Sequence, residues 1–502
     1  MRYTQCIMYY KLLIIYNTLQ LHLVSNSEDD FVEKRCGGKG GRVKMSTQTK
    51  KKLPMGFWAC STTEIFERFA YYTGRSILLV FVAASVASGG LGLSEGTAAT
   101  MQSQLTAFSY GLPILCSIIC DRLIGARYTT PIGMLLCGIG YWIGSMATSS
   151  GMVYAMIWCI SIGLAFYKTG PLIGRIVSSD QLNNAYSVRY GLVNIGAFAG
   201  PFLAGILYQD VFANGEMMGY RPCFKIAAIL MFLGAIWFTI GTRFMGEAGK
   251  TPFKKELTEE ELAREAELKA KNKEEKKMPY TTIEKKRIAA IILICVFAII
   301  FWIFWYLAYL PVYYFWGENA NWAVGGYNVP LTWFDAANAL FCVLVGMFVT
   351  PKLWSYLANR PKGDMSIYKK CALGIGTLGV GYLFFALMDV IRGDGQISCL
   401  WLLIFAILIT LGEMFFSPLG NAFIAKYAPS RIYSTMQSVW GLAIFFAAIS
   451  YGYVYNALFG GAIEFTTACI IIAVIAFVAV ALFVVLDKTL TALVEKKDEE
   501  KA

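Results

Sequence analysis

The class of this protein can be read from residues 62–85, TTEIFERFAYYTGRSILLVFVAAS. The stretch ends in an apolar run and is long enough to cross a bilayer as a helix. It also carries Glu64, Glu67, Arg68 and Arg75. Charges near the bilayer centre cost at least a few kcal/mol each unless they pair or face water. The stretch therefore predicts a membrane helix with one polar face.

The composition extends this prediction to the whole chain. Of its 502 residues, 57% are hydrophobic and 15% are charged, whereas a soluble protein carries about 25% charged residues. Apolar runs of about 20 residues recur along the chain. The sequence therefore predicts a multi-pass protein of the cell (plasma or inner) membrane, surrounded by lipid. The net charge of +11 comes from Lys and Arg clustered in particular loops, which indicates orientation in the membrane rather than nucleic-acid binding.

About twelve spans are predicted from length and apolarity. They cover residues 57–86, 98–119, 128–148, 152–175, 184–208, 222–243, 287–310, 330–355, 368–390, 397–418, 432–456 and 463–486. Residues 1–53 are interpreted as a cytoplasmic N-terminal segment, in which residues 1–44 differ from the rest; our hypothesis is that Met45 is the true start. Residues 488–502 are interpreted as a cytoplasmic tail.

The loops between the spans alternate in charge. Lys and Arg gather in every second connection, and the positive-inside bias places both termini in the cytoplasm. The longest connection, 244–286, is a charged, helix-forming linker. It separates an N-terminal six-helix bundle at 54–243 from a C-terminal one at 287–487. Six plus six spans around a polar linker is the major facilitator pattern, so we expect an all-α membrane protein whose two bundles meet around a site near the midplane.

The polar residues of the opening stretch share one helix face. Their spacing of three, one, three and four residues places these side chains in a single stripe: Glu64, Glu67, Arg68, Tyr71 and Arg75. The remaining surface suits lipid and carries Ile65, Phe66, Phe69, Ile77 and Leu78. The stripe is interpreted as the wall of a hydrated cavity; the alternative is a set of ion pairs between helices, or snorkelling at a membrane surface.

Lys168 and Glu413 are two of the further charges inside predicted spans. Lys168 needs a counter-ion, and the carboxylates of the first span are candidates. Glu413 has no evident partner in its own helix. Burial makes a carboxylate hold its proton more tightly and a nearby cation has the opposite effect, so such a group can load and release a proton. The alternative for Glu413 is a hydrogen bond between packed helices.

Several motifs resemble one family in the correct order. EIFERFAYYTGR, ICDRLIGARYTT, FYKTGPLIG, YSVRYGLVNIGAFAGP, VPLTWFDAANALF and GEMFFSPLGNAFIAKYAPSRIYSTMQSVWGLA resemble motifs of the proton-coupled oligopeptide transporters, a branch of the major facilitator superfamily. The likeness covers nearly all of residues 54–490. It implies proton-coupled symport of di- and tripeptides by alternating access, in a monomer without a cofactor and with the proton as the coupling ion.

The resemblance also implies roles at matching positions. The implied proton-coupling residues are Glu64, Glu67, Arg68, Lys168 and Glu413. Arg75 and Lys168, with Arg68 as a third candidate, would attract the substrate carboxylate, and Glu413 would receive its ammonium from the opposite bundle. The pocket would be lined by Tyr71, Tyr72, Tyr110, Tyr190, Asn194, Asn338 and Trp440.

Three departures and three alternatives accompany the resemblance. The glycine of the family signature is displaced in this chain, which has YYTG instead. Span seven, FWIFWYLAYLPVYYF, lacks the carboxylate that the family usually has there, and Asp335 stands where span eight usually has glutamine. Asp335 is interpreted as a partial replacement. The alternatives are a related carrier for nitrate, an amino-acid conjugate or a peptide-like compound, a transport-dead sensor, and a membrane enzyme. Enzyme chemistry is disfavoured, because the chain has no Walker A loop, no HExxH and a single histidine, His22, outside the spans.

Overall fold

The computed structural model describes residues 52–178, 180–252, 267, 279–361 and 363–495. The hypothesis about Met45, most of the linker helix and the last seven residues of the tail lie outside these described residues. The predicted spans are each represented by a long helix or by consecutive helical segments.

The N-terminal half consists of helices. They are α2 (Met55–Ala83), α3 (Glu95–Arg122), α4 (Ala126–Ser145), α5 (Ser150–Phe166), α6 (Thr169–Ile176), α7 (Leu182–Ile206) and α8 (Tyr220–Gly241). A π-helical turn, Leu207–Val211, extends α7, and a 3-10 turn, Thr242–Phe244, extends α8. The predicted fourth span is interrupted, because α5 ends at Phe166 and Lys168 caps the start of α6.

The C-terminal half repeats the helical plan with more interruptions. Its helices are α10 (Thr282–Leu307), α11 (Tyr309–Tyr313), α12 (Phe315–Asn319), α13 (Trp333–Leu344), α14 (Thr350–Ala358), α15 (Ile367–Arg392), α16 (Trp401–Tyr427), α17 (Tyr433–Phe459) and α18 (Phe465–Glu495). A π-helical turn, Val345–Val349, joins α13 to α14, and a 3-10 turn, Ser430–Ile432, precedes α17. A capping box between Thr281 and Glu284 starts α10 by satisfying free backbone N–H groups.

Four short strands lie in the connections of this half. Strand β1 (Ala320–Asn321) pairs in parallel with β4 (Ile397–Ser398), with Ala320 opposite Ile397. Strand β2 (Ala323–Val324) pairs antiparallel with β3 (Tyr327–Asn328) across a Gly325–Gly326 turn with positive φ at both glycines. Positive φ at two successive residues is the reason for glycine at this turn.

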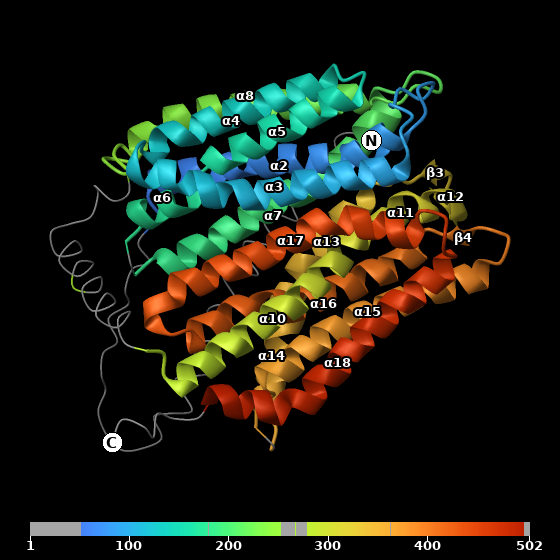
Figure 1. The fold of residues 1–502 in the computed structure, drawn as a ribbon. Coiled ribbons are helices and arrows are strands. Elements are labelled where there is room, and N and C mark those ends of the chain that lie inside the picture. Colours follow the sequence, from blue (N-terminus) through green and yellow to red (C-terminus); the bar gives the residue numbers. More distant parts are fainter. Residues whose placement is uncertain (1–51, 179, 253–266, 268–278, 362, 496–502) are drawn as a thin grey trace, which may run out of the picture. The chain divides into compact units, whose positions relative to one another are not determined.

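The helices form two bundles, which contact each other through two pairs of helices (Figure 1). Helices α2 to α8 make one bundle and α10 to α18 the other, with α3 beside α17 and α7 beside α13. Within the described residues, nine helical segments are long and apolar enough to cross a membrane. Helices α2, α3 and α4 are also long but more polar. The prediction of a multi-pass helical membrane protein with two bundles is confirmed.

Helix α2 lies inside its bundle rather than at the lipid boundary. It packs against α3, α7 and α8, and both Ile77 and Leu78 are completely buried. The prediction that these two residues face lipid is therefore wrong. The physical reason is that α2 is covered on several sides by neighbouring helices, so its apolar residues fill the bundle core.

Candidate functional site

The first part of the candidate site is a pair of buried carboxylates on α2. Glu64 is 2% exposed and Glu67 is 1% exposed. Arg68 donates to Glu67 through Nε at 2.5 Å and through Nη2 at 2.8 Å. Two parallel bonds from one guanidinium make a strong, geometrically fixed ion pair.

Glu64 forms a different ion pair, with a residue that the sequence analysis did not single out. Its Oε1 accepts from Nε of Arg189 on α7 at 2.8 Å and from the Thr169 hydroxyl at the start of α6 at 2.5 Å. Its other oxygen, Oε2, is buried without a hydrogen-bond partner. Arg189 lies inside the predicted fifth span, so the signal that marked Lys168, a charge within a span, also marked Arg189.

The Lys168 side chain contacts α3, whereas the carboxylates of α2 were its predicted partners. Its backbone N–H donates to the Thr130 hydroxyl at 3.3 Å, and its ammonium donates to the Pro113 carbonyl of α3 at 3.4 Å. Arg189, not Lys168, forms the ion pair with Glu64. The difference follows from the break between α5 and α6, because Lys168 caps α6 and its side chain reaches α3 instead of α2.

Arg75 lies farther along α2, and it is 6% exposed. Its guanidinium stands over the Tyr309 ring at 5.1 Å, while Nε and Nη2 have no hydrogen-bond partner. It interacts electrostatically with Asp335 of α13 in the other bundle. Asp335 is buried and accepts a hydrogen bond from the Tyr313 hydroxyl. The structure thus brings the carboxylate of span eight toward the arginine of span one.

Glu413 of α16 supplies negative charge from the C-terminal bundle. Its Oε2 accepts from the Cys342 thiol of α13 at 3.4 Å. The neighbouring Asn338 amide donates to the Thr410 hydroxyl at 2.9 Å. Glu413 interacts electrostatically with Arg75 and with Tyr190 of α7. Cationic and anionic groups therefore face one another from the two bundles.

The predicted lining residues separate into exposed and buried ones. Tyr110 is 50% exposed and Tyr190 is 55% exposed, and the Asn194 amide donates to the Tyr190 carbonyl at 2.8 Å. The rings of Tyr71 and Tyr72 meet edge to face at 5.4 Å, and Arg68 lies 5.4 Å over the Tyr71 ring. Trp440 is 5% exposed and fills space between α17 and α16. The structure therefore places Trp440 in helix packing.

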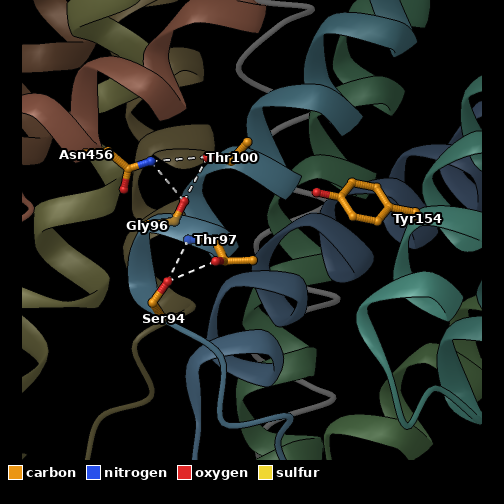
Figure 2. Close-up of a pocket in the computed structure, with 6 residues that line it drawn as sticks. All are labelled: Ser94, Gly96, Thr97, Thr100, Tyr154 and Asn456. Carbon is orange, nitrogen blue, oxygen red and sulfur yellow. Dashed lines mark hydrogen bonds between the residues drawn. The ribbon is translucent and has the colours of Figure 1, made fainter.

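At one end of the molecule the two bundles are joined by hydrogen bonds (Figure 2). The Asn456 amide of α17 donates to the Gly96 carbonyl at 3.3 Å and to the Thr100 hydroxyl at 3.2 Å, both on α3. The Tyr455 hydroxyl donates to Glu95 at 2.8 Å. A cavity of about 230 Å³ lies beside these contacts, between α3, α5 and α17. The loop charges assign this end to the outside.

Further contacts join the bundles at the same outer end through α7. The hydroxyl of Thr332 donates to the Pro201 carbonyl at 2.9 Å, and Trp333 donates to the Phe202 carbonyl at 3.0 Å. Tyr327 of the β2–β3 hairpin donates to Asp210 at 2.7 Å. Burial raises the pKa of Tyr327 to about 12, and the hydrogen bond to Asp210 adds to the rise. This phenol therefore stays a donor throughout the physiological pH range.

No group of three or more His, Cys, Asp or Glu side chains suited to a metal ion occurs among the residues that the structure describes. What these residues offer instead is a cation–anion arrangement with several protonatable carboxylates.

Comparisons with known proteins identify the family and the fold. The pattern of the Major Facilitator Superfamily matches residues 66–448. An uncharacterized transporter, YclF, of Bacillus subtilis is 25% identical over 78% of this chain and 85% of its own length. A di-/tripeptide transporter of Lactococcus lactis subsp. cremoris is 24% identical over 78% of this chain and 86% of its own.

A solved structure, the peptide transporter POT in complex with sulfate, superposes with a TM-score of 0.77 at 22% identity. The match covers 88% of this chain and 96% of that one. The resemblance drawn from the sequence motifs is thereby confirmed.

Proposed function

This chain belongs to the Major Facilitator Superfamily, and we propose that it carries di- and tripeptides with protons across the cell membrane by alternating access. The names of the relatives support peptides as the substrate class. The proposal includes a monomer that works without covalent chemistry and without a cofactor, the proton being the coupling ion.

The observation that carries the proposal is the charge arrangement between the bundles. Arg75 is buried with two nitrogens free of hydrogen bonds, and Glu413 lies in the opposite bundle within electrostatic reach. A buried donor without a partner is unfavourable unless a ligand satisfies it. A peptide zwitterion matches this site, because its carboxylate suits Arg75 and its ammonium suits Glu413.

The remaining polar groups fit the same scheme. Tyr71, Tyr72, Tyr110, Tyr190, Asn194 and Asn338 would contact the backbone of the peptide, and Lys168 and Arg68 would add positive charge near its carboxylate. Such contacts read the backbone and leave the side chains of the peptide loosely specified. Glu64, Glu67 and Glu413 are the proposed proton carriers, with Arg68 as the cation paired with Glu67.

The proposal is tested with the purified protein in liposomes. A labelled dipeptide is supplied with and without an inward proton gradient, and uptake is measured over time. Accumulation above equilibrium with the gradient, and equilibration without it, is the expected result. Uptake that is unaffected by the gradient would reject proton coupling, and absence of uptake would reject the peptide as substrate.

The same vesicles distinguish a carrier for another small solute. Unlabelled dialanine should compete with the labelled dipeptide, whereas nitrate should not. A nitrate carrier has no use for Glu413, because nitrate has no ammonium group. Competition by nitrate without competition by dialanine would favour that alternative.

A further inference from the structure

We propose that Arg189 is the counter-ion through which the protonation of Glu64 controls the contact between α7 and α2. This inference rests on the proposed proton-coupled transport and names a residue beyond the predicted coupling set. Arg189 acts as a positioning residue: it holds α7 on α2 when Glu64 is charged and releases it when Glu64 is neutral.

The two oxygens of Glu64 have different surroundings. Oε1 accepts from both Arg189 and Thr169, whereas Oε2 is buried and has no hydrogen-bond partner. A proton therefore binds at Oε2 without displacing either donor. The ion pair changes from neutral to singly positive, and the Coulomb attraction between the buried carboxylate and the partly exposed guanidinium is lost.

The two ends of helix α7 contact α2 in different ways, so loss of the ion pair affects only one end. Toward its outer half, α7 approaches α2 closely: an added Cβ at Gly196 would lie 2.9 Å from the Ile65 carbonyl oxygen, and one at Gly200 would lie 2.7 Å from that of Phe69. Arg189 lies about two turns before Gly196, where the helix contact depends on charge. Loss of the ion pair frees this end while the glycine contacts persist.

The outer end of α7 is hydrogen-bonded to the second bundle. Pro201 and Phe202 of α7 accept hydrogen bonds from Thr332 and Trp333 at the start of α13. Asp335, which faces Arg75, is on the same helix α13. The protonation state of Glu64 is thereby linked through α7 to α13, the helix that carries Asp335 and Asn338 of the proposed substrate site.

The other charged and titratable groups around Glu64 do not replace Arg189. They come from α2, α4 and the α5–α6 break, and are Cys60, Glu67, Arg68, Arg127 and Tyr167. Arg68 is engaged by Glu67 through two bonds. Arg127 donates to the carbonyls of Gly246 and Ala248. Arg189 makes the ion pair with Glu64.

The test compares Arg189→Gln and Arg189→Lys with wild type in the same liposomes. Two processes are measured: gradient-driven accumulation of labelled dipeptide and counterflow exchange at equal pH on both sides. Arg189→Gln should reduce accumulation by about 5- to 150-fold, the usual range of coupling between sites, while counterflow is retained. Arg189→Lys keeps the charge and should restore most of the accumulation.

The control is Arg243→Gln, which neutralises an exposed arginine in the 3-10 turn after α8. It should leave both processes within about twofold of wild type. Wild-type accumulation in Arg189→Gln, or an equal fall of accumulation and counterflow, would overturn the inference. If Arg189→Gln does not fold, the test depends on Arg189→Lys alone. Because this variant keeps the positive charge, loss of accumulation in the folded protein would contradict the inference. A wild type inactive in both processes would instead overturn the proposed function, and the inference with it.

Discussion

At the scale of single residues, Arg75 is the side chain that we propose binds the carboxylate of the substrate. It is 6% exposed, with Nε and Nη2 unpaired. The prediction is that Arg75→Lys weakens binding of a dipeptide by about tenfold or more, because a charge-assisted hydrogen bond contributes about 1.5–3 kcal/mol. A lysine keeps the charge and loses the fork that matches a carboxylate.

A matched pair of substrates checks this assignment. The apparent affinities of a dipeptide and of its C-terminal amide are measured by competition in wild type and in Arg75→Lys. The amide lacks the carboxylate, so its already weaker binding should change little. An equal loss for both compounds would show that Arg75 does not recognise the carboxylate.

Glu413 makes the complementary residue-scale prediction. It contacts the Cys342 thiol and interacts electrostatically with Arg75 from the other bundle. Glu413→Gln keeps the size of the side chain and removes its charge. Binding of a dipeptide with a free ammonium should fall by about tenfold, whereas its N-acetylated form, which has no ammonium, should bind equally to both proteins. Competition assays measure both values, and an equal fall for the two forms would contradict the role.

At the scale of the elements, the contact between α16 and α17 depends on a glycine. A Cβ at Gly420 would lie 2.1 Å from the nearest ring atom of Trp440, and the next two nearest atoms belong to the same ring. The rigid indole ring of Trp440 cannot move aside for the added methyl group as a flexible side chain can. Gly420→Ala should therefore lower stability by about 1–3 kcal/mol, as overpacking does.

Thermal unfolding in detergent measures this effect. The control is Gly346→Ala, at which a Cβ would meet Met414 Sδ at 3.7 Å, an ordinary contact. We expect a lower unfolding midpoint for Gly420→Ala and little change for Gly346→Ala. If Gly420→Ala unfolded at the same temperature as wild type, Trp440 would have to be more mobile than its 5% exposure indicates.

The elements also show what sequence reasoning reaches and where it stops. The spans were predictable because length and apolarity are properties of one segment. Burial of Ile77 and Leu78 was not, because it depends on which helices cover α2. The Glu64–Arg189 pair joins residues 125 positions apart, and a single sequence contains no information on that proximity. The motif resemblance identified Glu64 but offered Lys168 as its partner.

At the scale of the whole molecule, the two ends of the bundles differ. The outer end is joined by side-chain bonds between α3 and α17 and between α7 and the start of α13. Tyr110 and Tyr190, farther toward the end that the charge pattern assigns to the cytoplasm, are about half exposed. From this difference between the ends of the described part of the chain, we predict that the proposed site is open toward the cytoplasm and closed toward the outside.

Labelling from outside the membrane measures whether the outer end is closed. Tyr190→Cys, made in a background without other reactive cysteines, reports access to the site through labelling by a membrane-impermeant thiol reagent. Asn456→Ala removes the amide that bonds to Gly96 and Thr100. Gly96→Ala would bring a methyl group within 1.8 Å of the Asn456 Oδ1 position. Each change weakens the outer contact, so external labelling should accelerate by about 2- to 10-fold, as expected for 0.5–1.5 kcal/mol per lost hydrogen bond.

Asn359→Ala is the control, because the Asn359 amide donates to the Ser355 carbonyl of α14 and takes no part in the outer contact. This change should not alter labelling. Two results would contradict closure of the outer end by these hydrogen bonds. One is rapid external labelling of Tyr190→Cys alone, and the other is no acceleration when either Asn456→Ala or Gly96→Ala is added.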